Sequence, residues 1–394
     1  MASNTPSLQP GAPSPSFFKR IANMVSGDPV QSVLYLMGFL LVFLIVAAIF
    51  ANIMSGGYTL EQFIRGLTYG LAQGSIYALV ALGYTLVYGI LGMINFAHGE
   101  VFMSGAYIGF FALYAMNEAG WMESSPFFAL LLTIVIGMLA SIIVAVLLER
   151  IAYRPLRNAP RLVPLITAIG ASITIRELFT RLFGGAARVY PDVHLYVLSG
   201  VFREECDVVN DVTVCRGIDM IAGRYDVNLL GLNLTLRPLV FIIFALAILL
   251  MASLWFIVKR TKTGKAMRAV AEDKNTASLM GVNVNRVIVI TFVLGAALAG
   301  AAGVLFALYD GRATPGMGFS FGIKAFTAAV LGGIGNIPGA MFGGLFLGVV
   351  ESVAPSLLQM PDQLSDVIAF GMLVLVLIFR PTGIFGEVLS KKKA

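Results

Sequence analysis

A polar, glycine-rich patch beside two long apolar runs constrains the fold more than any other feature of this chain. Residues 63–90 and 101–116 are apolar, yet the sequence LGMINFAHGEVFMSGAY (residues 91–107) contains Asn95, His98 and Glu100. Near the centre of a bilayer, polar groups are costly unless protein or water satisfies them, and non-helical backbone is tolerated only inside protein or beside a water-filled cavity. We therefore expect the chain to break here, beside a path that a polar molecule crosses. The alternative is a short cytoplasmic turn between two ordinary spans.

The composition excludes a soluble protein. Of 394 residues, 58% are hydrophobic and 12% are charged, and several runs exceed the roughly 20 apolar residues that a membrane-spanning helix needs. A transmembrane β-barrel would show short alternating segments instead, and the sequence has no basic face typical of a nucleic-acid-binding module. We expect an all-α polytopic membrane protein with about eight transmembrane helices and additional broken or re-entrant glycine-rich segments.

Basic residues indicate which ends of the spans face the cytoplasm. They gather before the first apolar run, in residues 149–161 and 259–286, and at the C-terminus, so both termini are predicted to be cytoplasmic. Residues 1–30 form a tail whose composition favours disorder, and residues 387–394 form a basic tail. Residues 31–57 predict an additional N-terminal helix, with its apolar run at 33–53, because that run is too long for a signal-peptide core and lacks a clear cleavage site.

The longest polar stretch, residues 184–236, is expected to face the periplasm. It contains Cys206 and Cys215 in the sequence EECDVVNDVTVCRG. Two thiols so close together, in a loop facing an oxidising compartment, favour a disulfide that closes a small hairpin; a pair of free thiols is the alternative. A metal site is not expected, because two cysteines without nearby histidines supply too few ligands.

The basic loop at residues 259–286 has a pattern of its own. Residues 265–280 predict one amphipathic helix, because apolar residues recur at helical spacing among the charges. These residues are Ala266, Ala269, Val270, Ala277 and Met280. Gly281 follows as a helix terminator. A structured helix between two spans is unusual for a simple pore and favours docking of a cytoplasmic partner.

A second break is predicted at residues 331–340, because residues that disfavour a helix crowd there. They are Gly332, Gly333, Gly335 and Pro338. We expect residues 323–353 to form a half-helix, a turn and a second helix, since a single span would place the C-terminal lysines outside. Interrupted segments in two halves of a chain are typical of the pathway of a transporter built from repeats; a chance similarity from biased composition is the alternative.

Three blocks of sequence are specific in their order and spacing. They are ALGYTLVYGILGMINFAHGEVFMSGAY (residues 81–107), RAVAEDKNTASLMGVNVNRVIVITFVLGAALAGAAGVL (residues 268–305) and AFTAAVLGGIGNIPGAMFGGLFLGVVE (residues 325–351). Together they closely resemble the LivH-type permease subunit of bacterial branched-chain amino acid ABC importers. The resemblance covers residues 58–386, which it implies are the permease transmembrane domain; the additional first helix and the cysteine-bearing loop depart from the pattern.

The resemblance implies an inner-membrane permease with a pseudo-repeated ABC importer fold. Such a subunit lies in membrane lipid and pairs with an M-type permease subunit, and the pair sits on two cytoplasmic ATP-binding subunits. A periplasmic substrate-binding protein delivers leucine, isoleucine or valine. No cofactor, metal or nucleic acid is implied. The sequence has no GxxxxGK[ST] phosphate-binding loop, so ATP hydrolysis is expected on a separate polypeptide, and this chain is not expected to be an enzyme.

The resemblance also implies that the loop at residues 259–286 contains the coupling helix that docks the ATPase. The importer docking motif, Glu-Ala-Ala followed by three residues and Gly, aligns with residues 275–281, where only Ala277 and Gly281 match. Contact with the ATPase is therefore expected to depend also on Arg268, Glu272 and Asp273.

An aliphatic zwitterion needs an apolar path with a few polar groups for its charged ends. The candidate pathway residues lie in the two breaks and the helix before the first. They are Tyr84, Tyr88, Asn95, His98, Gly99, Glu100, Ser104, Gly333, Gly335 and Asn336. Among them, His98 and Glu100 are alternatively expected to fix the first break. A proton-carrying His98 would suit a secondary transporter, and a metal-binding His98 lacks a second clustered ligand.

Two other functions remain open at this level. A related permease branch carries urea or short amides, and the binding protein sets much of the selectivity in such systems. An ion-coupled transporter or channel working alone would leave residues 265–281 without a partner. An embedded hydrolase is the weakest rival, because the sequence shows no Gly-x-Ser-x-Gly elbow and no His-Glu-x-x-His pair.

Overall fold

The computed structural model describes residues 54–386, with gaps at 158, 161, 192, 198–204, 210–211, 217, 230–231 and 381, together with Ala47, Ala51 and Asn52. The chain divides into two units, Met1–Ala51 and Asn52–Ala394. The tail at residues 1–30, most of the additional helix at residues 31–57 and the basic tail at residues 387–394 lie outside the described residues. The fold described below is that of the second unit.

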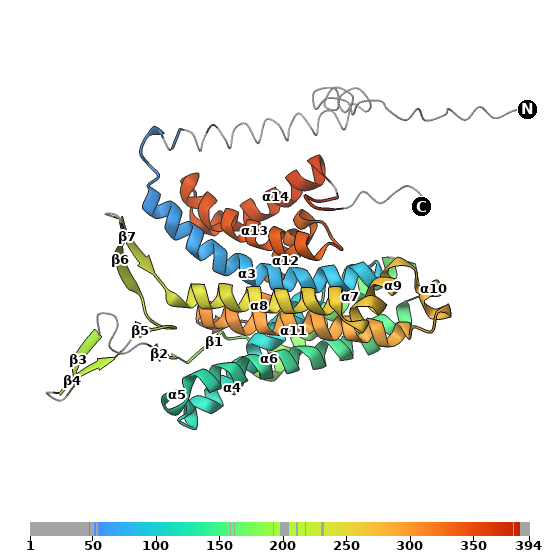
Figure 1. Cartoon of the computed structure of the whole chain (residues 1–394), viewed down its shortest axis with the longest axis horizontal. Coiled ribbons are helices and arrows are strands. Elements are labelled where there is room, and N and C mark those ends of the chain that lie inside the picture. Colours follow the sequence, from blue (N-terminus) through green and yellow to red (C-terminus); the bar gives the residue numbers. More distant parts are fainter. Residues whose placement is uncertain are drawn as a thin grey trace, which may run out of the picture. The chain divides into compact units, whose positions relative to one another are not determined.

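Helices make up most of this unit (Figure 1). Among the described residues, seven helices are long and apolar enough to cross a membrane. They are α3 (Leu60–Leu91), α4 (His98–Glu118), α6 (Pro126–Leu148, continued by η1, Glu149–Tyr153, and η2, Arg154–Leu156), α7 (Leu162–Phe183), α8 (Pro238–Arg260), α11 (Val284–Asp310) and α13 (Ile337–Leu357). The shorter helices are α5 (Trp121–Ser124), α9 (Lys262–Glu272), α10 (Lys274–Leu279), α12 (Met317–Gly332), η3 (Asp362–Leu364) and α14 (Ser365–Phe379). The expected all-α polytopic membrane fold is confirmed.

Local capping signals explain where several of these helices begin. Thr59 precedes α3 and forms a capping box with Gln62, in which each side chain accepts a hydrogen bond from the other residue's backbone N–H. Pro126 and Pro238 lie in the first turns of α6 and α8, where the missing proline N–H costs nothing. The apolar runs at residues 63–90 and 101–116 lie within α3 and α4, because apolar length is a local property of the sequence.

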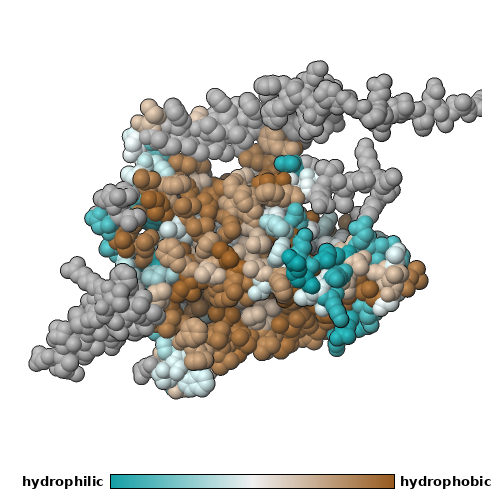
Figure 2. Space-filling model, viewed as in Figure 1, coloured by the Kyte–Doolittle hydropathy of each residue, from teal (hydrophilic) through white to brown (hydrophobic). Residues whose placement is uncertain are grey.

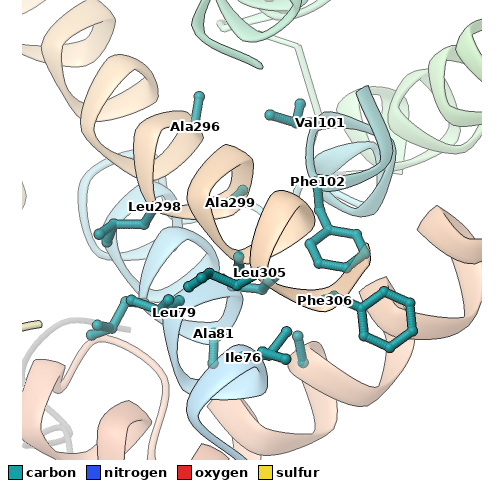
Figure 3. Close-up of a cluster of buried hydrophobic side chains, with 14 of the residues drawn as sticks. Ile76, Leu79, Ala81, Val101, Phe102, Ala296, Leu298, Ala299, Leu305 and Phe306 are labelled. Atoms are coloured by element: carbon teal, nitrogen blue, oxygen red, sulfur yellow. The ribbon is translucent and has the colours of Figure 1, made fainter. Parts of the chain in front are cut away.

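Helix α3 forms the centre of the unit. Its membrane-spanning part is 89% buried, and it packs against α13, α11, α12 and α8. Side chains of α3, α4 and α11 form a continuous buried cluster (Figure 3), in which the Phe102 and Phe306 ring centroids lie 5.9 Å apart. Glycines allow α3 and α13 to approach closely: a Cβ built on Gly74 would lie 2.8 Å from Leu345 Cα. Such small-residue contacts replace the hydrophobic effect as the source of packing inside a membrane.

Helices α6, α7 and α8 lie at the periphery. Only 22–28% of their spanning parts is buried, and the face shown in Figure 2, where α8 lies in front, is largely hydrophobic. Exposed large apolar side chains such as Phe128, Ile166 and Phe241 would be unfavourable in water but are expected on a surface that faces lipid or another membrane subunit.

The polar stretch between α7 and α8, together with the short strand β8 after α11, forms antiparallel strand pairs at the end of the unit opposite α9 and α10 (Figure 1). The strands are β1 (Arg188–Val189) with β8 (Arg312–Ala313), β2 (Tyr196–Val197) with β5 (Ile218–Asp219), β3 (Glu205–Val209) with β4 (Val212–Arg216), and β6 (Tyr225–Leu229) with β7 (Leu232–Leu236). The expected small hairpin is confirmed as β3–β4, and its register places Cys206 directly opposite Cys215.

Candidate functional site at the two glycine-rich breaks

The first predicted break is a short turn between two complete candidate spans, α3 and α4, which agrees with the alternative expectation. Helix α3 ends at Leu91, and Gly92 continues in the left-handed region with φ of +71° while its N–H donates to Tyr88 O at 2.8 Å. Helix α4 starts at His98. Only residues 92–97, named the first break below, are therefore non-helical. The next span was expected from residue 101, but α4 already begins at His98, because His98 and Glu100 satisfy their backbone within the helix and bury their side chains against neighbouring helices.

His98 packs into a space that only a glycine leaves open. Its ring lies edge-on to Tyr84, with centroids 4.9 Å apart, and a Cβ built on Gly83 would overlap His98 Nε2. His98 is 3% exposed and Tyr84 is 4% exposed. In this conformation both side chains belong to the contact between α3 and α4, which fits the expectation that His98 fixes the break.

Gly99 and Glu100 join the start of α4 to α12 and α7. A Cβ on Gly99 would overlap Gly318 O, so the two helices meet backbone to backbone. Glu100 is buried, and its Oε1 accepts a hydrogen bond from Ser172 Oγ on α7 at 3.0 Å. A buried carboxyl group of this kind needs such partners, because burial of an unsatisfied charged group costs several kcal/mol.

Asn95 and Ser104 are buried and engaged in contacts within the chain. Asn95 Oδ1 accepts a hydrogen bond of 2.7 Å from the hydroxyl of Tyr153, which lies in the π-turn η1 after α6. The Ser104 hydroxyl donates to Val101 O at 2.7 Å and lies 3.4 Å from Ser141 Oγ on α6. Sequence reasoning missed Tyr153, because a tyrosine in the basic segment after a span carries no local signal of a long-range contact.

The second break divides α12 from α13, as predicted. It comprises residues 333–336, in which Gly333 and Gly335 have φ of +99° and +95°. Asn336 caps α13 by accepting a hydrogen bond from Gly339 N at 3.2 Å, and its Nδ2 donates to Phe385 O at 2.9 Å. These positive φ values disfavour other residue types, so the glycines explain why the helix stops here.

The two breaks lie next to each other. A Cβ on Gly89, just before the first break, would lie 3.9 Å from Gly335 Cα in the second. Between them is a small pocket, named the break pocket below. It is lined by Tyr84, Tyr88, Ile94, Phe326, Ala329 and Ile334. Tyr88 is the most open of the candidate tyrosines at 36% exposed. The pocket exposes only apolar surface and, at about 10 Å³, has space for about one water molecule in this conformation.

The basic loop forms two helices where one was predicted. Helix α9 ends at Glu272, and Asp273 begins α10 by accepting hydrogen bonds from Asn275 N and Thr276 N. An aspartate side chain competes with the helical backbone in this way and favours an N-cap over a helix interior. The prediction of one continuous helix is therefore wrong, whereas Gly281 ends α10 with φ of +82°, as expected.

The candidate coupling residues face in different directions. Ala277 is buried together with Met267 and Val270, and the Arg268 guanidinium donates to Val258 O at the end of α8. By contrast, Leu279 is 88% exposed and Met280 is 81% exposed. Met280, which was expected on the apolar side of one continuous helix, is therefore exposed, because the helix is interrupted at Asp273.

Lys274 connects this loop to the first break, a contact that the sequence did not reveal. Its Nζ donates to Leu91 O, the last carbonyl of α3, at 3.2 Å. Partial burial, together with the nearby Arg157 charge, lowers the pKa of Lys274 from its ordinary value. A cation at the C-terminal end of a helix is favourable because it meets unpaired carbonyl groups and the negative end of the helix dipole.

Comparisons with known proteins agree with this architecture. The family described as "Branched-chain amino acid transport system / permease component" matches residues 66–377. The chain is 44% identical to the high-affinity branched-chain amino acid transport permease BraD of Pseudomonas aeruginosa, over 83% of this chain and 96% of BraD. It is 40% identical to LivH of Escherichia coli K12, over 84% of this chain and 96% of LivH. No solved structure matches this chain.

A more distant match comes from the second permease of the same system. LivM of Escherichia coli K12 is 26% identical over 96% of this chain and 81% of LivM. The match to BraD and LivH covers nearly their whole length, at an identity that leaves no doubt about common descent. This chain belongs to the family of permease components of branched-chain amino acid transport systems.

Proposed function

We propose that this chain carries leucine, isoleucine and valine across a bacterial inner membrane as one of two permease subunits. The second is an M-type permease related to LivM, two cytoplasmic ATP-binding subunits supply the energy, and a periplasmic binding protein delivers the substrate. ATP binding and hydrolysis shift the pathway between outward-open and inward-open states, because a ligand favours the state that it binds more tightly.

The contact between the two breaks is the observation that supports this role. Glycine-rich interruptions in the two halves of a transporter are typical of its pathway, and the break pocket between them exposes apolar surface, with Tyr84 and Tyr88 among its lining residues. In the pathway that we propose, Tyr88 contacts the substrate, while His98, Gly99 and Glu100 hold the start of α4. Gly333, Gly335 and Asn336 form the opposite wall.

The exposed end of α10 supports ATPase docking. Leu279 and Met280 protrude from a loop whose other exposed residues are mostly polar, and hydrophilic residues gather at this end of the molecule (Figure 2). An exposed apolar pair surrounded by polar residues is typical of a protein interface. We assign to Leu279 and Met280 the apolar centre of the contact, and to Arg268, Glu272 and Asp273 its polar surroundings.

The same end of the unit is proposed to be cytoplasmic. Helices α9 and α10 lie there, together with the last described residues before the C-terminus (Figure 1), and basic residues predominate in this loop. The positive-inside rule places such loops in the cytoplasm. The strand pairs between α7 and α8 would then face the periplasm.

Uptake of labelled leucine into proteoliposomes containing the complete complex tests the function. We expect leucine uptake that requires both ATP and the binding protein, and no uptake of labelled urea. Preferential uptake of urea would replace the substrate assignment. If this chain alone concentrated leucine without the ATP-binding subunits, the ABC mechanism would be excluded.

Co-purification tests the docking assignment. The double variant Leu279→Ser, Met280→Ser removes the exposed apolar pair without disturbing buried contacts, and we expect the ATP-binding subunits to be lost from the purified complex. Met54→Ser is the matched control, because Met54 is also apolar and 71% exposed but precedes α3. Retention of the ATP-binding subunits by the double variant would contradict the assignment.

The Cys206–Cys215 disulfide is also proposed, supported by the facing positions of the two residues in the β3–β4 register. We expect a membrane-impermeant thiol reagent to label the two cysteines only after reduction. Labelling of the unreduced protein would exclude the disulfide.

A further inference from the structure

Three helices meet at a cluster of charges on Lys324. Its Nζ lies 2.5 Å from Glu351 Oε1 on α13 and 2.6 Å from Asp366 Oδ1 at the start of α14. The side chains of Lys324 and Glu351 are 9% and 2% exposed, whereas that of Asp366 is 55% exposed. These three residues, named the Lys324 cluster, therefore comprise a buried ion pair on the α12–α13 hairpin and a more open carboxylate that joins α14 to it.

The surroundings of the cluster fix the position of the lysine. Its Nζ lies 5.9 Å from the centroid of the Phe321 ring, and the Phe321 ring centroid lies 5.6 Å from that of Tyr77 on α3. The buried Tyr77 hydroxyl accepts a hydrogen bond of 2.7 Å from Gln73 Nε2. Lys324 thus has a defined place between the central helix and the hairpin.

Helix α14 packs against α12 and α13 along one side only. Ala369 is its one buried residue among those described, and apolar side chains on its other side, such as Val367, Val374 and Leu377, are exposed. Apolar packing on one side leaves α14 free to slide or turn on the hairpin unless directed contacts fix its position. Asp366 supplies an attachment at its first turn, where a negative charge is also favourable for the helix dipole.

The segment after α14 is attached at the other end of the hairpin. Ile384 N donates to Leu331 O at 2.8 Å, and Phe385 N donates to Gly332 O at 3.2 Å. Asn336 Nδ2 completes this contact by donating to Phe385 O. Helix α14 is consequently held at both ends, by the Lys324 cluster at its start and by the second break after its end.

Stability alone is a poor explanation for the Lys324 cluster. Removing charges from water costs more than a buried pair commonly returns, and apolar replacements of similar volume are often as stable. Short, directed contacts between charged groups do, however, fix the position of those groups relative to one another. The Lys324 cluster would therefore fix the position of α14 relative to the α12–α13 hairpin.

We infer that Lys324 is a positioning residue for transport: through Asp366 it holds the start of α14 to the α12–α13 hairpin, so that α14 and residues 384–385 keep the second break in its working geometry. The inference rests on the proposed function, since the second break forms one wall of the break pocket. In this role, Lys324, Glu351 and Asp366 do not contact the substrate themselves.

The variant Asp366→Asn tests the inference with little risk to folding, because it leaves the buried Lys324–Glu351 pair intact. In the complete complex in proteoliposomes, we expect about tenfold less leucine transported per ATP hydrolysed, within the range of coupling effects of residues remote from a site. In hydrogen exchange, we expect the amides of Ile384 and Phe385 to exchange faster. Asp366→Glu keeps the charge and should restore both values.

Two further variants separate positioning from folding. The triple variant Lys324→Met, Glu351→Gln, Asp366→Asn removes all three charges and should remain folded, yet show the same loss of leucine per ATP. Glu61→Gln removes an exposed ion pair with Arg65 at the start of α3 and should behave like the wild type.

An unchanged ratio of leucine to ATP in Asp366→Asn would overturn the inference, as would a lowered ratio without faster exchange at Ile384 and Phe385. A wild-type complex without ATP-dependent leucine uptake would instead refute the proposed function. The exchange measurement does not depend on transport, so it would still decide whether Asp366 holds α14 in place.

Discussion

The two glycine-rich breaks resemble each other in sequence but differ in what holds them. The first, residues 92–97, is fixed from two directions: Tyr153 of η1 donates to Asn95, and Lys274 of α10 donates to the end of α3. The second, residues 333–336, contacts the segment after α14 through Asn336 and Phe385. The first break is thus directly connected to the loop that we propose to dock the ATPase, whereas the second has no hydrogen bond to that loop among the described residues.

This difference indicates a division of roles. Movement of α10 would act on the first break at once, through Lys274 and the last carbonyl of α3. It would reach the second break across the contact between Gly89 and Gly335. The first break is therefore expected to be the moving wall of the break pocket, and the second the wall held in place by α14.

The largest expected effect concerns the packing beside the first break. In Gly99→Leu, the new side chain overlaps Gly318 O, and forcing it in costs about 3 kcal/mol or more of packing free energy. We expect leucine uptake to fall to background while the protein stays in the membrane. Gly170→Leu on α7 is the control, because a Cβ there meets open space. Normal uptake by Gly99→Leu would mean that this break is only a turn.

A smaller effect should distinguish the two breaks directly. Tyr153→Phe leaves the buried Asn95 oxygen without its donor, which costs about 1–3 kcal/mol, and should speed amide exchange at residues 92–97 only. Asn336→Ala removes a helix cap worth about 1 kcal/mol and should speed exchange at residues 333–336 only. If either variant loosened both breaks equally, the breaks would form one unit and the comparison would fail.

The smallest effect is expected from the connection to the docking loop. Lys274→Met removes one hydrogen bond to Leu91 O, worth about 1 kcal/mol, and should lower leucine uptake about fivefold without loss of the ATP-binding subunits. Lys262→Met, at an exposed lysine of α9, should leave uptake unchanged. Equal uptake by the two variants would show that α10 reaches the first break by another contact.

Local signals predicted the elements of this site better than their contacts. The glycines at 92, 333 and 335 predicted both breaks, because glycine is the residue type that adopts a positive φ most readily. The same reasoning extended the first break too far, since it treated His98 and Glu100 as residues that a helix could not hold. In the fold, Gly83 makes room for the histidine ring, and Ser172 donates a hydrogen bond to one of the two carboxylate oxygens of Glu100.

The sequence by itself determined the class of protein, the positions of the spans, both breaks and the family, because apolar length, helix-breaking residues and motif order are all read along the chain. The tertiary structure alone decided that the two breaks meet, that Tyr153 and Lys274 hold the first, and that Lys324 joins three helices. Each of these contacts connects residues far apart in the sequence. Their energies depend on burial and on distance in space, which no local pattern of residues records.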